Sequence, residues 1–319
     1  MKKKVIIDCD PGMDDSMAIV LACKSNQLDV LAVTTVNGNY PVAVTQINAR
    51  KTLEMIGHEE ITVAAGLGKP LVRETPKDPF THGKDGQGEN FLPAPTMPLS
   101  NQHAVDVIIE LVRANPGEIT LICCGPLSNI ALAFIKAPDI KDKIKEIVAI
   151  SGAFGITKYA YINATGDNPQ SEWNVFVDPE AADIVYNSGV SFTAIGLDIA
   201  THFDVDFTEG QLKAIQECDH REAQFLAQAI KFTHNRGYGA YTTIIDCLAP
   251  AFVIAPEIFT VFQGKVGIEL GGKYSVGNTV LERRAHHAWD NMTTIDIADS
   301  LDYPKLLEMI VHAVVEPRR

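Results

Sequence analysis

Four aspartates stand close together near the amino terminus, and their spacing suggests metal chemistry. The segment reads Asp8-Cys9-Asp10-Pro11-Gly12-Met13-Asp14-Asp15. Carboxylates this close repel one another unless a cation or solvent offsets their charge. The segment offers oxygen ligands, and the chain has no histidine or cysteine set at zinc spacing, so the favoured ion is Ca²⁺ or Mg²⁺. The ligand spacing and distal glutamate of an EF-hand are missing. A solvated acidic turn, in which Asp14 and Asp15 only cap a helix, is the alternative.

The flanking sequence predicts how these aspartates are positioned. Val5 to Ile7 is a short apolar run that ends at a turn, which predicts a buried strand. Helical spacing begins at Ser16, so Asp14 and Asp15 fall in a first helical turn, where the helix dipole favours negative charge. We therefore expect the acidic group at the carboxyl end of a first strand, the usual place for a site in an open α/β sheet.

Another aspartate stands in an apolar setting far along the chain. Asp246 lies within Thr-Ile-Ile-Asp-Cys-Leu-Ala at 243–249, in a predicted helical region that begins at about Tyr241. A carboxylate is costly to bury without a partner, so a cation or a set of buried hydrogen bonds must offset it. We favour a metal ligand over a structural hydrogen-bonding role.

Glu172 and Asn174 are two residues apart, so extended backbone would place both side chains on the same face. A carboxylate and an amide on one face suit the hydroxyl groups of a sugar. Side chains of this kind also tie loops to their own backbone. The residues alone leave both interpretations open.

Taken together, these segments resemble the inosine-uridine type nucleoside hydrolases. The run from Asp8 to Asp15 is similar to the amino-terminal signature of that family, which is long and unusual. Further similar segments extend the resemblance over essentially the whole chain: the His-Gly at 82–83, Gly-Pro-Leu-Ser-Asn at 125–129, Glu-Trp-Asn at 172–174 followed by Asp-Pro-Glu-Ala-Ala at 178–182, and the Asp-x-x-Ala that begins at Asp246.

The resemblance implies a Ca²⁺ cofactor and a catalytic base. The implied ligands are Asp10, Asp15, Asp246 and the backbone carbonyl of Cys124. Relatives typically have threonine at the position of Cys124, and a carbonyl ligand tolerates either side chain. Asp10 resembles the general base, which would activate an ion-bound water.

The resemblance also implies the side chains that bind ribose: Asp14, Asn39, Glu172 and Asn174. An upstream asparagine binds the sugar in relatives as well. Asn163 is the better match because Asn-Ala-Thr recurs there, but its longer spacing to Glu172 keeps Asn168 open.

The residue before the last metal aspartate departs from the family pattern. Many relatives have histidine there, thought to protonate the leaving base, and a purine-preferring group has tryptophan. This chain has Ile245, which can do neither. His82, in a long Gly- and Pro-rich loop over 66–100, and His234 are the candidate acids. The alternatives are a leaving group that needs little help, or weak turnover.

The reaction that the resemblance implies is hydrolysis of the N-glycosidic bond of ribonucleosides to ribose and free base, through an oxocarbenium-like transition state. A ribosyl-binding or regulatory protein with little or no turnover is the alternative that Ile245 motivates. A third hypothesis is an aspartyl-phosphate phosphatase, because Asp8-x-Asp10 follows a strand. It is disfavoured because no basic phosphate-binding residue stands nearby in the sequence.

Alternating strand and helix patterns predict an α/β fold with an open, mostly parallel, Rossmann-like sheet and a small antiparallel addition near the carboxyl terminus. We expect a single domain over 1–319. The patterns also predict a strand at 191–199 that ends in Asp198, and a long helix over 209–233.

Composition and charge narrow the class of partner. The formal net charge of −13 argues against nucleic acid, which requires a basic face, and fits a neutral nucleoside better. No apolar run reaches membrane-spanning length. Only three apolar residues stand between Lys4 and Asp8, which is too few for a signal-peptide core. Six cysteines show no disulfide or zinc pattern. We expect a cytoplasmic enzyme without a membrane partner, and the resemblance implies a homodimer or homotetramer.

Overall fold

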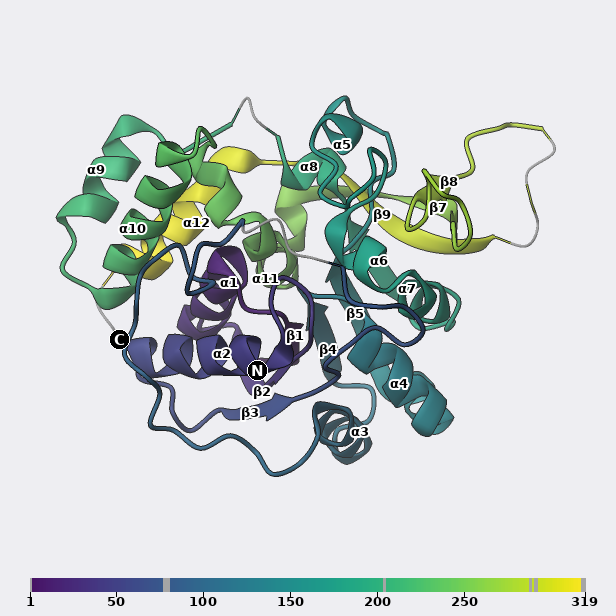
Figure 1. The fold of residues 1–319 in the computed structure, drawn as a ribbon, viewed down its shortest axis with the longest axis horizontal. Coiled ribbons are helices and arrows are strands. Elements are labelled where there is room, and N and C mark those ends of the chain that lie inside the picture. The colour runs from purple at the N-terminus through teal and green to yellow at the C-terminus, as the bar shows by residue number, and fades with distance from the viewer. Residues whose placement is uncertain (1, 77–80, 203–204, 287–288, 290–291, 317–319) are drawn as a thin grey trace.

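The computed structural model describes residues 2–76, 81–202, 205–286, 289 and 292–316. Its centre is a nine-stranded sheet with the order β3-β2-β1-β4-β5-β6-β9-β7-β8 (Figure 1). The strands are β1 (Lys3–Cys9), β2 (Leu28–Thr35), β3 (Thr62–Ala65), β4 (Ile119–Cys123), β5 (Ile144–Ile150), β6 (Phe192–Ile195), β7 (Phe259–Ile268), β8 (Thr279–Leu281) and β9 (Thr293–Leu301).

The sheet is parallel from β3 through to β9, and only its last two strands break this pattern. β7 pairs antiparallel with β9, and β8 pairs antiparallel with β7. The predicted fold class, a mostly parallel sheet with an antiparallel addition near the carboxyl terminus, is confirmed.

Helices cover both faces of the sheet (Figure 1). They are α1 (Met13–Lys24), α2 (Val42–Ile56), α3 (Ala104–Ala114), α4 (Ser128–Lys136), α5 (Tyr159–Ile162), α6 (Trp173–Val177), α7 (Pro179–Tyr186), α8 (Leu197–Ala200), α9 (Glu209–Glu217), α10 (Arg221–Asn235), α11 (Leu248–Ile254) and α12 (Tyr303–Val315). Short 3-10 helices are η1 (Pro138–Lys143), η2 (Ala240–Thr243), η3 (Ile245–Cys247) and η4 (Pro256–Ile258).

Two large apolar clusters form the core, one on each face of the sheet. Val5 and Ile7 of β1 belong to the cluster that packs against α1, α2, α10, α11 and α12, whereas Ile6 belongs to the cluster with α3, α4 and α7. Successive side chains of a strand point to opposite faces, so one apolar run supplies both clusters. This is why β1 reads as continuously hydrophobic. In the described part of the chain no helix combines the length and apolarity needed to cross a membrane.

Two of the predicted elements are wrong. The strand expected over 191–199 ends at Ile195, and Asp198 lies in the short helix α8. There its carboxylate accepts hydrogen bonds from the backbone N–H groups of Phe154 and Thr157, at 2.8 and 3.1 Å. These contacts with a distant loop favour a turn that the local pattern does not indicate.

The single helix expected over 209–233 is two helices, α9 and α10. Cys218 between them has extended backbone, with φ −84° and ψ 131°, and helical structure resumes at Arg221. The Cys218 sulfur lies 3.9 Å from the carbonyl oxygens of Val314 and Val315 at the end of α12. Packing against α12 therefore interrupts a sequence that has helical character throughout.

Candidate active site and metal centre

The site lies where the chain order of the sheet reverses. Strands β3, β2 and β1 run outward on one side and β4, β5 and β6 on the other, so the carboxyl ends of β1 and β4 flank a crevice. Asp10 follows β1, Asn39 comes after β2, and Cys124 follows β4. Parallel pairing brings these three residues to one edge of the sheet.

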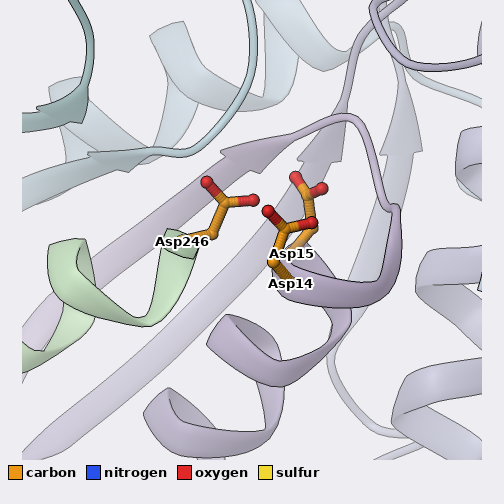
Figure 2. Close-up of side chains that lie close together, drawn as sticks. All are labelled: Asp14, Asp15 and Asp246. Carbon is orange, nitrogen blue, oxygen red and sulfur yellow. The ribbon is translucent and has the colours of Figure 1, made fainter. Parts of the chain in front are cut away.

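Asp14, Asp15 and Asp246 form a compact acidic group. Each offers a carboxylate oxygen, and these oxygens lie within 4.8 Å of one another (Figure 2). Asp14 and Asp15 come from the first turn of α1, and Asp246 comes from η3. All three are buried. The structure thus brings Asp246 to the amino-terminal acidic segment, although the two are far apart in the sequence.

Asp15 combines this position with a structural role. Its two oxygens accept hydrogen bonds from the backbone N–H groups of Asp10, at 3.1 Å, and Gly12, at 2.9 Å. Gly12 is the residue before the first turn of α1, and a carboxylate there satisfies N–H groups that the helix leaves open. Asp15 therefore both caps α1 and belongs to the acidic group, so the two interpretations of this residue are compatible.

Asp10 stands beside the compact group rather than within it. We expected Asp10 among the ligands and Asp14 among the sugar-binding residues, but the tight group of three contains Asp14. Asp10 Oδ2 accepts the Asn39 N–H at 2.6 Å, and Oδ1 has no hydrogen-bond partner among the described residues. A Cβ on Gly38 would collide with Oδ2, and one on Gly125 would lie 2.7 Å from Oδ1. The two glycines therefore leave room for this carboxylate.

The electrostatics of the group favour a bound cation. Burial raises the pKa of Asp14 to about 7, and burial followed by the charge of Asp14 raises that of Asp15 to about 6. Burial, and then the neighbouring carboxylates, also raise the pKa of Asp10 and of Asp246. Asp14 Oδ1, like Asp10 Oδ1, has no hydrogen-bond partner in the described residues. Buried oxygens with open lone pairs and no compensating charge fit a hard divalent ion.

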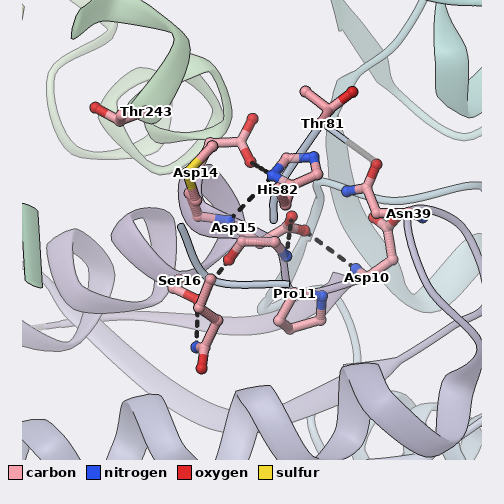
Figure 3. Close-up of polar contacts among 12 residues, drawn as sticks. Asp10, Pro11, Asp14, Asp15, Ser16, Asn39, Thr81, His82 and Thr243 are labelled. Carbon is pink, nitrogen blue, oxygen red and sulfur yellow. Dashed lines mark hydrogen bonds and ion pairs between the residues drawn. The ribbon is translucent and has the colours of Figure 1, made fainter. Parts of the chain in front are cut away.

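His82 lies over the first turn of α1 (Figure 3). Its Nδ1 accepts the Met13 N–H at 3.2 Å and stands 3.6 Å from Asp14 Oδ1. A neutral imidazole that accepts through Nδ1 carries its proton on Nε2. The ring is buried, so the loop that carries it is folded down onto the acidic group.

A cavity of about 410 Å³ opens above these residues. Its walls combine the acidic group with polar, aromatic and aliphatic side chains, among them Asp14, Asn39, His82, Cys124, Asn163, Glu172, Asn174, Ile245 and Asp246. A cavity of this size with a few converging polar groups suits a small molecule.

Glu172 and Asn174 both line the cavity, but not because of extended backbone. Glu172 precedes the first turn of α6, and its carboxylate accepts the N–H groups of Asn174 and Val175 at 2.7 and 3.0 Å. Gly152 donates a third hydrogen bond at 3.2 Å. Burial raises the Glu172 pKa to about 7. The prediction of extended backbone at 172–174 is wrong, because a helix begins there. Glu172 binds the backbone and also lines the cavity, so the two interpretations of its side chain are compatible.

The Asn174 amide joins the ends of two strands. It donates to the carbonyl oxygen of Cys124 at 2.9 Å and to that of Ile150 at 3.1 Å. The Cys124 carbonyl, expected as a metal ligand, therefore already accepts one hydrogen bond. A carbonyl oxygen has a second lone pair, so this contact is compatible with a ligand role.

Two expected residues are not at the cavity. His234 is exposed near the end of α10, and its neighbours Thr233 and Arg236 line the cavity instead. Asn168 donates to the Val276 carbonyl at 2.8 Å and is not a lining residue. Asn163 does line the cavity, with its amide donating to the Thr201 carbonyl at 2.9 Å. The geometry favours Asn163 of the two candidate asparagines and argues against His234.

Sequence reasoning missed a group of cavity residues that lie at the end of α10 and between α10 and Asp246. These are Phe232, Arg236, Tyr238 and Tyr241. The sequence did offer a signal for this group: two tyrosines and two glycines stand within residues 237–241, shortly before Asp246.

Known proteins resemble this chain both in sequence and in fold. The sequence matches the family described as inosine-uridine preferring nucleoside hydrolase over residues 5–308. It is 36% identical over 320 residues to the inosine-uridine preferring nucleoside hydrolase of Leishmania major, covering 98% of each chain. It is 33% identical over 326 residues to probable uridine nucleosidase 1 of Oryza sativa subsp. japonica, covering 99% of this chain and 98% of that one.

Among solved structures, a plant nucleoside hydrolase superposes with a TM-score of 0.87 at 29% identity, over 99% of this chain and 100% of the other. Since these matches run along nearly the whole of each protein, the chain belongs to the inosine-uridine preferring nucleoside hydrolase family.

Proposed function

We propose that this nucleoside hydrolase cleaves the N-glycosidic bond of ribonucleosides, with Ca²⁺ as its cofactor and Asp10 as its general base. The observation that carries the proposal is the buried group of Asp14, Asp15 and Asp246 beneath a cavity that also contains Glu172 and Asn174. The names of the relatives support a nucleoside substrate: that of the Leishmania protein mentions inosine and uridine, and that of the rice protein mentions uridine. One catalytic domain over 1–319 is part of the proposal, supported by the single sheet.

The donor set supports a hard divalent cation held by Asp15 and Asp246, together with Asp14 or Asp10 and the Cys124 carbonyl. All of these groups offer oxygen, and Asp10 Oδ1 and Asp14 Oδ1 are buried without a hydrogen-bond partner among the described residues. Such an ion would anchor sugar hydroxyls and make an attacking water more acidic.

Asp10 is suited to take the proton of that water. The Asn39 N–H fixes one of its oxygens and leaves the other open. Burial, and then the charge of Asp15, raise its pKa, and a carboxylate with a raised pKa is a stronger base. The position beside the compact group, rather than inside it, is consistent with a base that keeps a free oxygen.

Ribose binding falls to the polar wall of the cavity. Glu172 and Asn174 are held rigidly by the start of α6 and by the ends of β4 and β5. Asp14, Asn39 and Asn163 line the same cavity. Rigid contacts to the sugar favour the flattened, positively charged ring of the transition state over the substrate.

The part of the cavity proposed to hold the departing base offers few groups that could donate a proton. Ile245 lines the cavity and offers no proton. With His234 outside the cavity, His82 is the remaining histidine of the two candidates. We propose His82 as the group that faces the departing base.

A panel of uridine, cytidine, inosine, adenosine and guanosine tests the proposal, with free ribose measured with Ca²⁺, after chelation, and after Ca²⁺ is restored. We expect ribose release that chelation abolishes and Ca²⁺ restores. Asp10→Asn should lower kcat by about 10²–10⁴-fold, the usual contribution of a general base. Asp219→Asn, at an exposed carboxylate, is the matched control.

Three outcomes would count against the proposal. Inertness toward every N-riboside would contradict hydrolysis, and tight nucleoside binding without product would favour the ribosyl-binding alternative. Phosphate release from sugar phosphates would favour the phosphatase hypothesis. Light scattering during size exclusion would test the proposed homodimer or homotetramer.

A further inference from the structure

The loop over residues 82–91, which carries His82, is organised around one carboxylate. Asp85 Oδ1 accepts the N–H groups of Gln87 and Glu89, each at 2.9 Å, and Oδ2 accepts that of Phe91 at 2.7 Å. Three backbone donors thus converge on a side chain that does not itself line the cavity. We propose that Asp85 is a positioning residue for hydrolysis: it folds this loop so that His82 is held over the first turn of α1.

The hydrogen bonds connect Asp85 to His82 directly. Gly88 lies between two of the residues whose N–H groups Asp85 binds, and its own N–H donates to the His82 carbonyl at 2.8 Å. The chain therefore turns back on itself, and the segment that Asp85 holds also holds the backbone of His82. At the other end of this connection, His82 Nδ1 accepts the Met13 N–H.

The backbone conformation shows why a strong acceptor is needed. Glu89 and Phe91 have φ of 58° and 47°, a region that side chains other than glycine rarely adopt. Hydrogen bonds to an ionised carboxylate are stronger than neutral ones. The Asp85 carboxylate accepts the N–H groups of both Glu89 and Phe91, so these hydrogen bonds offset the strain of the two residues. Without them, we expect the loop to adopt another conformation.

Other contacts fix where the loop sits without replacing Asp85. The Asn48 amide donates to the Asp85 carbonyl at 3.2 Å, and the Tyr40 hydroxyl donates to the Gly83 carbonyl. Both come from the region of α2 and hold the start of the loop. In the half that contains 87–91, the Gln87 amide donates to Ser16 Oγ at 3.0 Å and to Thr52 Oγ1 at 3.1 Å, and these contacts also hold the loop in place. The backbone N–H groups that shape its turn, however, are bound by the Asp85 carboxylate. Loss of Asp85 should therefore shift His82 without removing the loop from the protein.

The inference rests on the proposed function, in which His82 faces the departing base, and a double-mutant cycle tests it. Asp85→Ala should lower kcat for a nucleoside by about the same factor as His82→Ala, on the order of 10²-fold for a displaced group. Adding Asp85→Ala to His82→Ala should cost less than about 2-fold more, because residues that act as a unit are not additive. Lys84→Ala, at the exposed neighbouring residue, should behave as wild type.

Further readouts separate positioning from general loss of structure. Asp85→Asn keeps one acceptor oxygen and should retain more activity than Asp85→Ala. Ca²⁺ affinity, measured by calorimetry, and the melting temperature should change little in both variants. Additive losses in the double mutant, a wild-type kcat in Asp85→Ala or His82→Ala, or an equal loss of Ca²⁺ affinity would each overturn the inference.

Hydrogen exchange gives a test that does not need turnover. Asp85→Ala should raise amide exchange in the 82–91 segment by about tenfold or more, as expected when local hydrogen bonds open, and should leave the strands of the sheet unchanged. Unchanged exchange would overturn the inference even in an active enzyme. A wild-type protein without ribose release would instead contradict the proposed function, and the exchange experiment would still decide whether Asp85 folds the loop.

Discussion

Ile245 stands at the cavity where the family resemblance leads us to expect a histidine that protonates the departing base. It lines the cavity immediately before Asp246, which belongs to the compact acidic group. Consecutive residues of η3 thus contribute an aliphatic side chain and a carboxylate to the same cavity. The aliphatic side chain can supply no proton.

Substituting Ile245→His should restore a proton donor at this position. We expect kcat for uridine and inosine to rise by about 10-fold or more, since general-acid help is worth about 10²–10⁴-fold when well placed. A riboside whose leaving group is stable without protonation should gain little. Steady-state kinetics on both substrate types measure the difference, and Ile245→Leu is the control for side-chain size. The absence of any gain would mean that another group, with His82 the first candidate, already protonates the base.

At the scale of elements, α1 is the helix on which the site depends. Its residues from Met13 to Ala22 are all buried, so it is packed on every side rather than along one stripe. Its carboxyl-terminal end is joined to α10 by an ion pair between Lys24 and Glu222. The Lys24 and Glu222 side chains are only 11% and 2% exposed. A buried ion pair fixes the position of α1 and therefore that of Asp14 and Asp15.

Breaking this pair should destabilise the protein strongly. Glu222→Ala should lower the free energy of unfolding by about 3–5 kcal/mol, because it leaves the Lys24 ammonium buried without its partner. Urea unfolding followed by circular dichroism measures the loss. The comparison is Asp139→Ala, which breaks a pair with Arg113 whose side chains are about half exposed and should stay close to wild type. Equal effects of the two substitutions would show that the Lys24–Glu222 pair does not anchor α1.

At the scale of the whole molecule, the acidic site works against stability unless a cation is bound. The group draws together α1 and η3, which lie far apart in the sequence. Burial raises the pKa of Asp14 from 3.8 to about 7 and of Glu172 from 4.5 to about 7. The folded, metal-free protein therefore binds protons at these groups more tightly than the unfolded chain does.

The stability of the metal-free protein should consequently fall as pH rises. Groups with a raised folded pKa contribute most below their unfolded value, near pH 4, and this contribution is lost as pH passes about 7. Ca²⁺ binds the deprotonated carboxylates, so it should stabilise the protein more at pH 8 than at pH 5. At 100 times its Kd the ion adds about 2.7 kcal/mol.

Melting temperatures at pH 5 and pH 8, with chelator and with Ca²⁺, measure this effect. NaCl at the same ionic strength is the control, because a monovalent ion should not bind this group of carboxylates. A Ca²⁺ effect that is equal at both pH values, or absent, would contradict a metal centre built from these carboxylates.

The sequence by itself determined the elements with strong local patterns. The apolar run Val5–Ile7 lies inside β1, as predicted. It also determined that acidic side chains follow the first strand, because parallel sheets place functional side chains at that edge. The cost of burying a lone carboxylate correctly singled out Asp246, which the structure brings to the acidic group.

The tertiary structure alone decided which of these residues meet. It placed Asp14 rather than Asp10 in the compact group, Asn163 rather than Asn168 at the cavity, and His234 on the exposed side of α10. Local periodicity carries no information about contacts between segments that lie far apart in the chain. Those contacts depend on hydrogen bonds and packing between distant segments, such as the bond from Asn174 to the Cys124 carbonyl, and they form only when the sheet assembles.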